Sequence, residues 1–338
     1  MADTVPTQET TAPVATESTE SSTASTASAV DETEALVAAA QAEGELLVYS
    51  ATPEPVAQPL YDAFTAEYGI KVNTIPRVVT SELIARFEGE LSSGGSPADV
   101  ISIASPTFYQ GHVDDGVVTP VADLALPALE GFPEEFVGDG YVDVGAAPIG
   151  VCFNSDAVND MTSYQDLLNP DLRAVWVDPT TNDPALAIWL VVGDDQGPDF
   201  ISQWAAREKT LTASVVPGAQ LVVAGEGDFV FPCYETIAMA LGNEGAPITY
   251  KVLGPTTGGD SYYGVVANSA HPAAARLFMN YIVSEEGQMA LTAGNYASPL
   301  GNDFPDAFTL PEDYVTIDLA FAERLNDERE SLIAALGV

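Results

Sequence analysis

The sequence predicts an α/β protein of two lobes, with mostly parallel sheets, helices on both faces and hinge strands between the lobes. From Asp31 onward, buried apolar runs alternate with amphipathic helical patterns, which is typical of a parallel sheet covered on both sides. After the stretch "GAAPIGVCFN" the alternation starts again, as expected for a second lobe. No apolar run approaches the roughly 18–20 residues of a membrane span.

The first half of this pattern contains three strands and three helices. Apolar residues spaced three and four apart mark the helices, glycines end two of them, and Ser81 is a suitable N-cap for the third. The expected segments are a helix over 32–43, a strand over 45–51, a helix over 55–68, a strand over 70–75, a helix over 81–91 and a strand over 98–104.

The second half repeats the pattern and ends in helices. Strands are expected in 174–178, 227–233, 248–253 and 262–267, and helices in 184–193, 199–208, 234–242, 271–293 and 318–335.

The charge balance limits the function classes. The chain has 338 residues, of which 50 are acidic and 10 basic, a formal net charge of −40. Nucleic acid is therefore not an expected partner, because neutralising phosphates requires clustered basic side chains. Such an acidic surface favours a soluble monomer and is consistent with a saline habitat.

Residues 1–30 form a separate zone rich in Ser, Thr, Ala, Glu and Pro, for which we expect disorder. The segment has no basic n-region and no apolar h-region, so no export signal is present in the sequence as given. It is similar to the spacer that follows the lipidated cysteine of a bacterial lipoprotein. We therefore expect an extracytoplasmic protein, periplasmic or on the cell surface, that meets the membrane only through a lipid anchor outside this sequence.

Polar residues gather where the predicted strands end. Ligands of open α/β sheets bind beyond the carboxyl ends of the strands. Six such exits, "YSATPE", "IPRVVTSE", "IASPTFY", "DPTTND", "FPCYET" and "GPTTGGDSYYG", all carry hydroxyl groups, and an arginine lies in the second. The candidate ligand-binding residues are Ser50, Thr52, Arg77, Thr80, Ser81, Ser105, Tyr234 and Tyr262.

Several sequence segments, in their order along the chain, resemble those of the iron(III)/2-aminoethylphosphonate-type extracellular solute-binding proteins of bacterial ABC importers. Among them are "AAAQAEGELLVYSA", "SPADVISIAS", "PIGVCFNSDAV" and "YGVVANSAHPAAARLFMNYIVSEEGQMAL". The resemblance implies a class II periplasmic-binding fold that captures a solute between two lobes and delivers it to a permease. It implies crossings near 146–150 and 262–266, with 31–146 plus 264–338 forming lobe 1 and 147–263 forming lobe 2.

The resemblance leaves two ligands open. Iron(III) binders of this family typically present two adjacent tyrosines at the junction matching "FPCYET", but here Cys233 precedes Tyr234 and the usual histidine has no counterpart. We therefore favour a small anion (phosphonate, phosphate ester or carboxylate) held at helix N-termini near Ser81, Ser105 and Tyr234. The alternative is ferric iron bound by Tyr234, Tyr262 and Tyr263. Further candidate ligands or lids are Tyr109, Asp178, Asp183 and Glu235.

The two cysteines, Cys152 and Cys233, allow two readings. In an exported protein they can form a disulfide. A thiol-dependent enzyme using Cys233 at a helix N-terminus is a remote alternative. The chain has no nucleophile elbow, P-loop or metalloprotease motif, so we expect a binding protein with no cofactor and no enzymatic activity.

Overall fold

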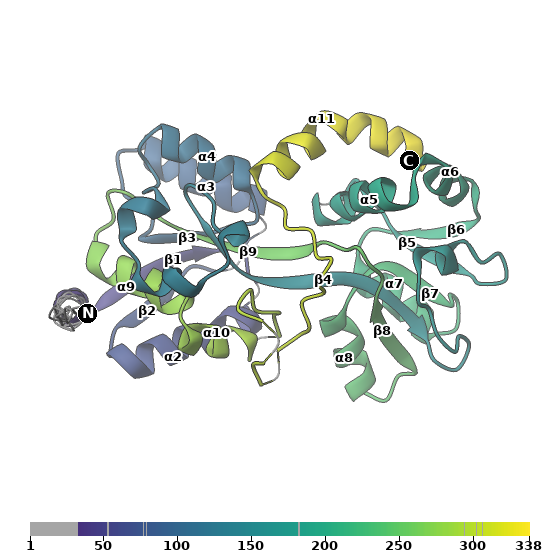
Figure 1. Ribbon diagram of the computed structural model, residues 1–338, viewed down its shortest axis with the longest axis horizontal. Coiled ribbons are helices and arrows are strands. Elements are labelled where there is room, and N and C mark those ends of the chain that lie inside the picture. Colours follow the sequence, from purple (N-terminus) through teal and green to yellow (C-terminus); the bar gives the residue numbers. More distant parts are fainter. Residues whose placement is uncertain are drawn as a thin grey trace, which may run out of the picture.

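The computed structural model describes residues 33–338 except for positions 53, 77, 79, 182, 294, 302 and 306. It has two lobes joined by two long strands, β4 (Val142–Asn154) and β9 (Gly258–Val265) (Figure 1). The predicted two-lobed α/β fold is confirmed. Within the described part of the chain, no helix is both long and apolar enough to cross a bilayer.

The remaining strands are β1 (Glu45–Ser50), β2 (Lys71–Thr74), β3 (Val100–Ser102), β5 (Ala174–Val177), β6 (Lys209–Thr212), β7 (Phe229–Tyr234) and β8 (Ile248–Val252). They form a sheet in the order β2-β1-β3-β9-β4-β7-β5-β6, with β8 paired to β4 beside this path. Pairing is parallel among β1, β2 and β3 and among β5, β6 and β7. The connecting strands β4 and β9 run antiparallel to their neighbours.

The chain passes between the lobes where β4 changes partner. Ala146 is paired with Asp260 of β9, whereas Gly150 is paired with Val252 of β8, so this crossing falls within the expected stretch. The return crossing lies over 253–257, earlier than the expected 262–266, because Tyr263 already pairs with lobe 1 strand β3. The two connecting strands approach closely, since a Cβ at Gly258 would collide with the carbonyl of Ala147.

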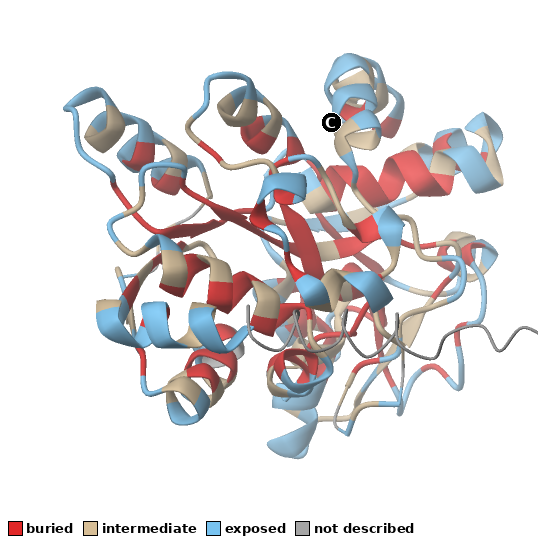
Figure 2. Ribbon diagram, turned by 60° about the vertical axis from the view of Figure 1, so that its left-hand side comes forward, coloured by how far each residue is buried: buried red, intermediate tan, exposed pale blue. Residues whose placement is uncertain are grey.

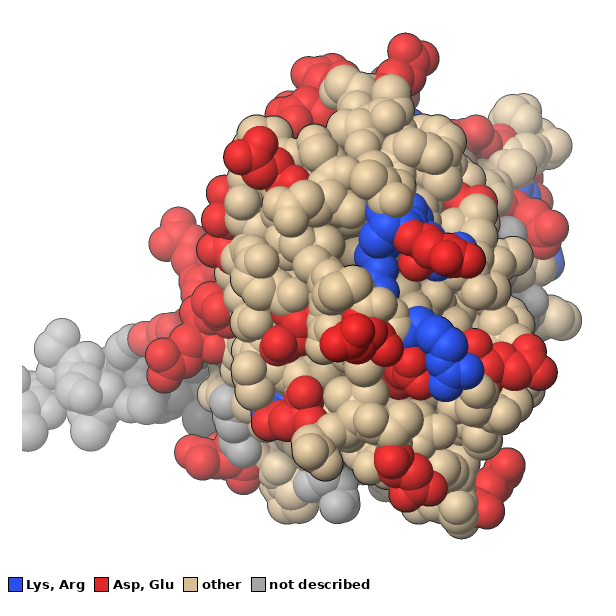
Figure 3. Space-filling model, turned by 90° about the vertical axis from the view of Figure 1, so that its right-hand side faces the viewer, with Lys and Arg blue, Asp and Glu red and all other residues tan. Residues whose placement is uncertain are grey.

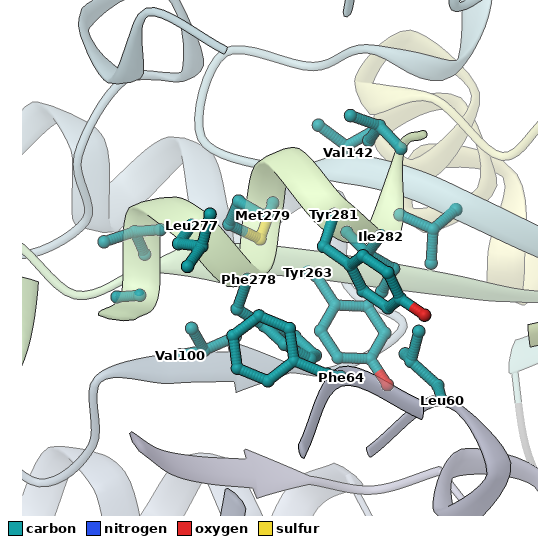
Figure 4. Close-up of a cluster of buried hydrophobic side chains, with 14 of the residues drawn as sticks. Leu60, Phe64, Val100, Val142, Tyr263, Leu277, Phe278, Met279, Tyr281 and Ile282 are labelled. Atoms are coloured by element: carbon teal, nitrogen blue, oxygen red, sulfur yellow. The ribbon is translucent and has the colours of Figure 1, made fainter. Parts of the chain in front are cut away.

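Lobe 1 has a hydrophobic core on each face of its sheet. One core packs the β-strands against α2, α9 and α10 and includes Phe64, Phe278 and Tyr263 (Figure 4). The other packs them against α3 and α4 and includes Phe87 and Tyr109. The helices are 33–43, α2 (Glu54–Tyr68), α3 (Thr80–Ser92), α4 (Pro106–Asp114), α9 (Pro272–Ile282) and α10 (Glu285–Thr292), with short 3-10 turns at Val121–Leu124, Pro127–Gly131 and Glu134–Phe136.

Lobe 2 is built in the same way. Its largest core contains three fully buried tryptophans, Trp176 of β5, Trp189 of α5 and Trp204 of α6. Helices α7 and α8 cover the opposite face of the sheet. The strands in the middle of the molecule are almost wholly buried, and exposed residues lie on the outer faces of the helices (Figure 2). The helices are α5 (Asp183–Gln196), α6 (Pro198–Ala206), α7 (Val215–Val223) and α8 (Glu235–Asn243), with a 3-10 turn at Tyr164–Leu168.

The last helix, α11 (Leu319–Leu336), packs on α5 and α6 of lobe 2 and also contacts α4 of lobe 1, although the sequence placed 264–338 in lobe 1. Its Leu325 and Leu336 are buried in the core of lobe 2. Arg324 of this helix pairs with Asp194 of α5 at 2.6 and 2.7 Å. The segment before α11 therefore crosses between the lobes a third time (Figure 1).

Candidate functional site

Two adjoining pockets lie at the carboxyl ends of the lobe 1 strands, and one of them also contacts α5 of lobe 2. The hinge pocket has a volume of about 130 Å³ and is lined by Ala51, Thr52, Thr80, Ser102, Ile103, Ala104, Gly259, Asp260, Ser261, Tyr262 and Tyr296. The helix pocket, of about 50 Å³, lies at the first turns of α4 and α5 and under α11. It is lined by Ala104, Ser105, Pro106, Thr107, Asp183, Pro184, Gly258, Asp260, Tyr262, Ile317, Ala322, Leu325 and Asn326.

The fold explains why hydroxyl groups meet in the hinge pocket. Strands β1 and β3 are parallel neighbours, so their carboxyl ends lie side by side. Thr52 follows β1 and Ser102 ends β3, and their hydroxyl oxygens are 3.4 Å apart. Thr80, the first residue of α3, also lines this pocket.

Asp260 is the carboxylate that both pockets share. The Tyr262 hydroxyl donates to it at 2.8 Å and the Ile317 backbone N–H at 3.2 Å, and the Tyr314 hydroxyl donates to its other oxygen. Burial raises the pKa of Asp260, while the hydrogen bonds from these two tyrosines act in the opposite direction.

A second buried carboxylate, Asp143 of β4, lies close to Asp260. Its Oδ1 accepts hydrogen bonds from the backbone N–H groups of Ser261 and Gly145, at 3.2 and 3.4 Å. Its Oδ2 is buried and has no hydrogen-bond partner within the described part of the chain. Burial, and then the charge of Asp260, raise the pKa of Asp143.

The described residues that line the two pockets include no lysine or arginine. Apart from Asp260, the lining has one other carboxylate, Asp183, which pairs with Arg329 of α11 at 2.8 Å. The described wall of the cleft therefore combines apolar residues with hydroxyl groups, and Asp260 is its one described carboxylate that is not paired with a basic side chain.

Tyr234 ends β7 and is the N-cap residue of α8, so it stands at the exit of a lobe 2 strand as predicted. Its hydroxyl lies close to Gly259, which lines the hinge pocket: a Cβ added to that glycine would be 3.9 Å from the Tyr234 hydroxyl. Burial, and then the charge of Asp260, raise the pKa of Tyr234. Its phenol is thus neutral at physiological pH unless a cation binds beside it.

The structure brings some of the predicted site residues together. Thr52, Thr80 and Tyr262 line the hinge pocket, and Ser105 lines the helix pocket, where its hydroxyl caps α4 by accepting from Phe108 N–H at 3.4 Å. The Ser50 hydroxyl instead accepts from the backbone N–H of Thr52 at 3.0 Å. Ser81 is exposed on α3, and Arg77 lies outside the described residues.

The tyrosines proposed beside Tyr234 point in different directions. Tyr262 and Tyr263 alternate across β9, as successive strand residues must. The Tyr262 hydroxyl is bonded to Asp260 and to the Ile317 carbonyl, whereas Tyr263 lies in the core of lobe 1 with its hydroxyl 3.3 Å from that of Tyr61 (Figure 4). Tyr109 is fully buried in lobe 1. The set of Tyr234, Tyr262 and Tyr263 as iron ligands stays a prediction, with Tyr262 and Tyr263 extending from opposite faces of β9.

Cys152 and Cys233 form a disulfide bond between β4 and β7, which confirms that prediction. Both sulfur atoms lie in the core beneath α7 and α8. In this state Cys233 has no thiol to serve as a ligand or a nucleophile, so the position beside Tyr234 is structural.

Four polar residues of the hinge pocket were missed from the sequence: Ser102, Asp260, Ser261 and Tyr296. Asp260 and Ser261 lie within the exit "GPTTGGDSYYG", where the two adjacent tyrosines seemed the stronger signal. Alternation along this strand was the available clue, because it shows that the two tyrosines face opposite sides.

A family model described as bacterial extracellular solute-binding protein matches residues 46–294. The chain belongs to this family. One relative is iron uptake protein A1 of Synechocystis sp. (strain ATCC 27184 / PCC 6803 / Kazusa), 25% identical over 288 residues, which cover 76% of each protein. The family match does not single out the 2-aminoethylphosphonate type that the sequence suggested.

Solved structures share the fold of this solute-binding protein. A Trichodesmium protein (IdiA, FutA) in complex with iron and citrate ligands matches with a TM-score of 0.68 and 21% identity, covering 87% of this chain and 99% of that one. The periplasmic binding protein AfuA of Actinobacillus pleuropneumoniae, with fructose-6-phosphate bound, matches with a TM-score of 0.63 and 20% identity, covering 86% and 97%. At this level of identity the likeness supports the fold alone.

Proposed function

We propose that this solute-binding protein captures ferric iron for an ABC importer. The observation that carries the proposal is the composition of the cleft: both pockets share a carboxylate, Asp260, several hydroxyl groups lie in the same walls, and no described basic residue lines them. The relative named iron uptake protein A1 supports the same cargo. The sequence alone favoured a small anion, but the buried carboxylate Asp260 in the wall of both pockets opposes a negatively charged ligand.

The cleft offers ligands suited to this ion. Fe³⁺ is a hard cation that prefers anionic oxygen, and carboxylates and phenolates supply it. Tyr234 is the candidate phenolate, because its hydroxyl stands beside the hinge pocket on the lobe 2 side. A bound trivalent cation would counter the burial and the Asp260 charge that hold the pKa of Tyr234 up.

The test is a titration of the metal-free protein with ferric ion supplied as its nitrilotriacetate complex. We expect a visible phenolate-to-iron absorption that saturates at one equivalent and is abolished in Tyr234→Phe. Tyr68→Phe, a half-buried tyrosine on α2 in lobe 1, is the matched control and should keep the colour. A parent protein that stays colourless would contradict the proposal.

A small organic anion is the second candidate, and the helix pocket is the observation that favours it. This pocket lies at the first turns of α4 and α5, where unpaired backbone N–H groups bind phosphate-like or carboxylate groups. A thermal-shift screen with inorganic phosphate, a phosphonate and a carboxylate would detect it. A ligand at about 100 times its dissociation constant adds roughly 2.7 kcal/mol. Ser105→Ala and Thr107→Val should then reduce the shift, because both residues line this pocket.

We also propose that the protein binds without catalysis, acts as a monomer outside the cytoplasm and hands its cargo to a permease. Its family of extracellular solute-binding proteins supports the location and the partner. The bonded state of Cys233 supports the absence of thiol chemistry.

A further inference from the structure

The pairing of β7 with β4 is irregular near the carboxyl end of β7. The register shifts between the pairs that Gly150 and Cys152 of β4 make with this strand. Pro232 lies in the interrupted part and, as a proline, has no N–H to donate to the ladder. A register shift of this kind disrupts the ladder locally and bends the strand. Backbone hydrogen bonds therefore support the end of β7 less than a regular ladder would.

The residue opposite Tyr234 has its backbone groups bonded elsewhere. Tyr234, the last residue of β7, is paired with Ile149 of β4. The Ile149 N–H donates to the Thr257 carbonyl at 2.8 Å, and the Ile149 carbonyl accepts from Thr256 Oγ1 at 2.7 Å. Ile149 is thus bonded to the return crossing over 253–257. This pair therefore adds little backbone hydrogen bonding to fix Tyr234 against β4.

The disulfide bond is a covalent constraint at this place. Cys233 immediately precedes Tyr234, and its partner Cys152 lies in β4, with the two Cα atoms 5.7 Å apart. Both cysteines are fully buried in the core beneath α7 and α8. The sulfur atoms are therefore not ligands for the cargo, and their effect on the cleft passes through the backbone of Tyr234.

Strand β4 is a firm support for this constraint. It is paired with β7 on one side and with β8 on the other. The contact with β8 is close, because a Cβ added at Gly150 would lie 2.3 Å from the Lys251 carbonyl oxygen. The disulfide thus ties the end of β7 to a strand that is itself held on both sides.

We propose that the Cys152–Cys233 disulfide is the positioning element for Tyr234. By holding the end of β7 against β4, it keeps the Tyr234 phenol beside the hinge pocket before the cargo arrives. A side chain that is already in place costs less ordering on binding, so the bond raises the affinity and fixes the geometry of the phenol oxygen. The inference rests on the proposed capture of ferric iron with Tyr234 as the phenolate.

The test compares the parent with the Cys152→Ala, Cys233→Ala double variant. A second disulfide-free variant, Cys152→Val with Cys233→Ala, fills more of the vacated volume and serves if the first does not fold. Substitution is preferred to reductant, because reductants also convert ferric to ferrous ion. Each metal-free protein is titrated with ferric nitrilotriacetate well below its unfolding temperature, and the phenolate-to-iron absorption band is recorded.

Ile201→Ala is the matched control for a general loss of stability. Ile201 is buried on α6, which packs on α5 and α11, so its truncation leaves a cavity in lobe 2 away from the junction of β7 with β4. This variant should unfold more easily than the parent and still bind ferric ion with the affinity and the absorption band of the parent.

We expect the disulfide-free variant to bind ferric ion about tenfold more weakly than the parent, with a shifted or weaker absorption band. A loss of lobe 2 stability alone would not move this band. A disulfide-free variant with the affinity and band of the parent would overturn the proposal. An equal loss of affinity in Ile201→Ala would overturn it too, because the cause would then be general destabilisation.

Failure of the proposed function has a different signature. A parent that stays colourless shows that the iron assignment is wrong, and the inference falls with it. A parent whose colour is lost in Tyr234→Phe but unchanged in the disulfide-free variant keeps the iron assignment and overturns the positioning role alone.

Discussion

At the scale of single residues, Asp228 shows how one paired carboxylate makes stability depend on pH. It accepts hydrogen bonds from the backbone N–H of Arg173 at 2.6 Å and from its Nε at 3.1 Å. The Arg173 side chain lowers the pKa of Asp228 below its unfolded value of about 4. The pair therefore stabilises the fold above about pH 4, and this stability is lost as the pH falls through the lower, folded-state pKa.

We predict that Asp228→Asn lowers the free energy of unfolding at pH 7 by about 1–3 kcal/mol, the range for a hydrogen bond to a charged group. The difference from the parent should shrink below about pH 4, where Asp228 becomes protonated in the parent as well. Urea unfolding at pH 7 and pH 3 measures both effects. The exposed Asp199→Asn is the control, and an equal loss in that variant would contradict the assignment.

Single residues also show where sequence reasoning ends. Hydroxyls at the ends of adjacent parallel strands can be placed together from the pattern alone, and Thr52, Thr80 and Ser105 do line the cleft. Whether a side chain in a strand faces the cleft or the core depends on register. Ser261 and Tyr263 are two residues apart in β9 and so extend from one face of the strand, while Asp260 and Tyr262 extend from the other.

At the scale of elements, the disulfide fixes two neighbouring strands of lobe 2. Cys152 of β4 and Cys233 of β7 are 81 residues apart in sequence, so the bond closes a long loop in the unfolded chain. We predict that the Cys152→Ala, Cys233→Ala double variant loses roughly 4–5 kcal/mol of unfolding free energy in the chain-entropy model. Denaturant unfolding measures this value. Reductant should lower the unfolding free energy of the parent toward that of the variant. A parent whose unfolding free energy is unchanged after its disulfide has been reduced would contradict the prediction.

Helices and strands of this chain follow from periodicity, but their placement between the lobes does not. Glycine stops and apolar spacing located α2 and α3 closely, whereas the expected helical stretch 271–293 is divided into α9 and α10. The sequence did not reveal that α11 packs on lobe 2, because an amphipathic pattern shows that one helix face is buried but not which surface covers it. Leu325 and Leu336 of this helix are buried in the same core as the tryptophans of lobe 2.

At the scale of the whole molecule, the acidic surface is the feature that sequence composition predicts most directly. On the face in Figure 3, acidic side chains are scattered over the surface and the few basic ones lie next to acidic ones. Ion pairs in the described part of the chain include Arg173 with Asp228. The 10 basic residues balance only a small part of the 50 acidic ones and leave a net charge of −40. Repulsion between carboxylates therefore acts against the folded state.

We therefore predict that salt stabilises the protein at pH 7. Raising NaCl from about 0.05 M to 1 M shortens the Debye length to about 3 Å, which screens repulsion between surface carboxylates more than it weakens their few ion pairs. The melting temperature in scanning calorimetry should rise over this range. Near pH 4, where about half of the carboxylates are protonated, the repulsion is smaller, so the same salt increase should raise the melting temperature by less. A salt effect of equal size at both pH values would show that charge repulsion is not its cause, because screening can act only where the carboxylates are ionised.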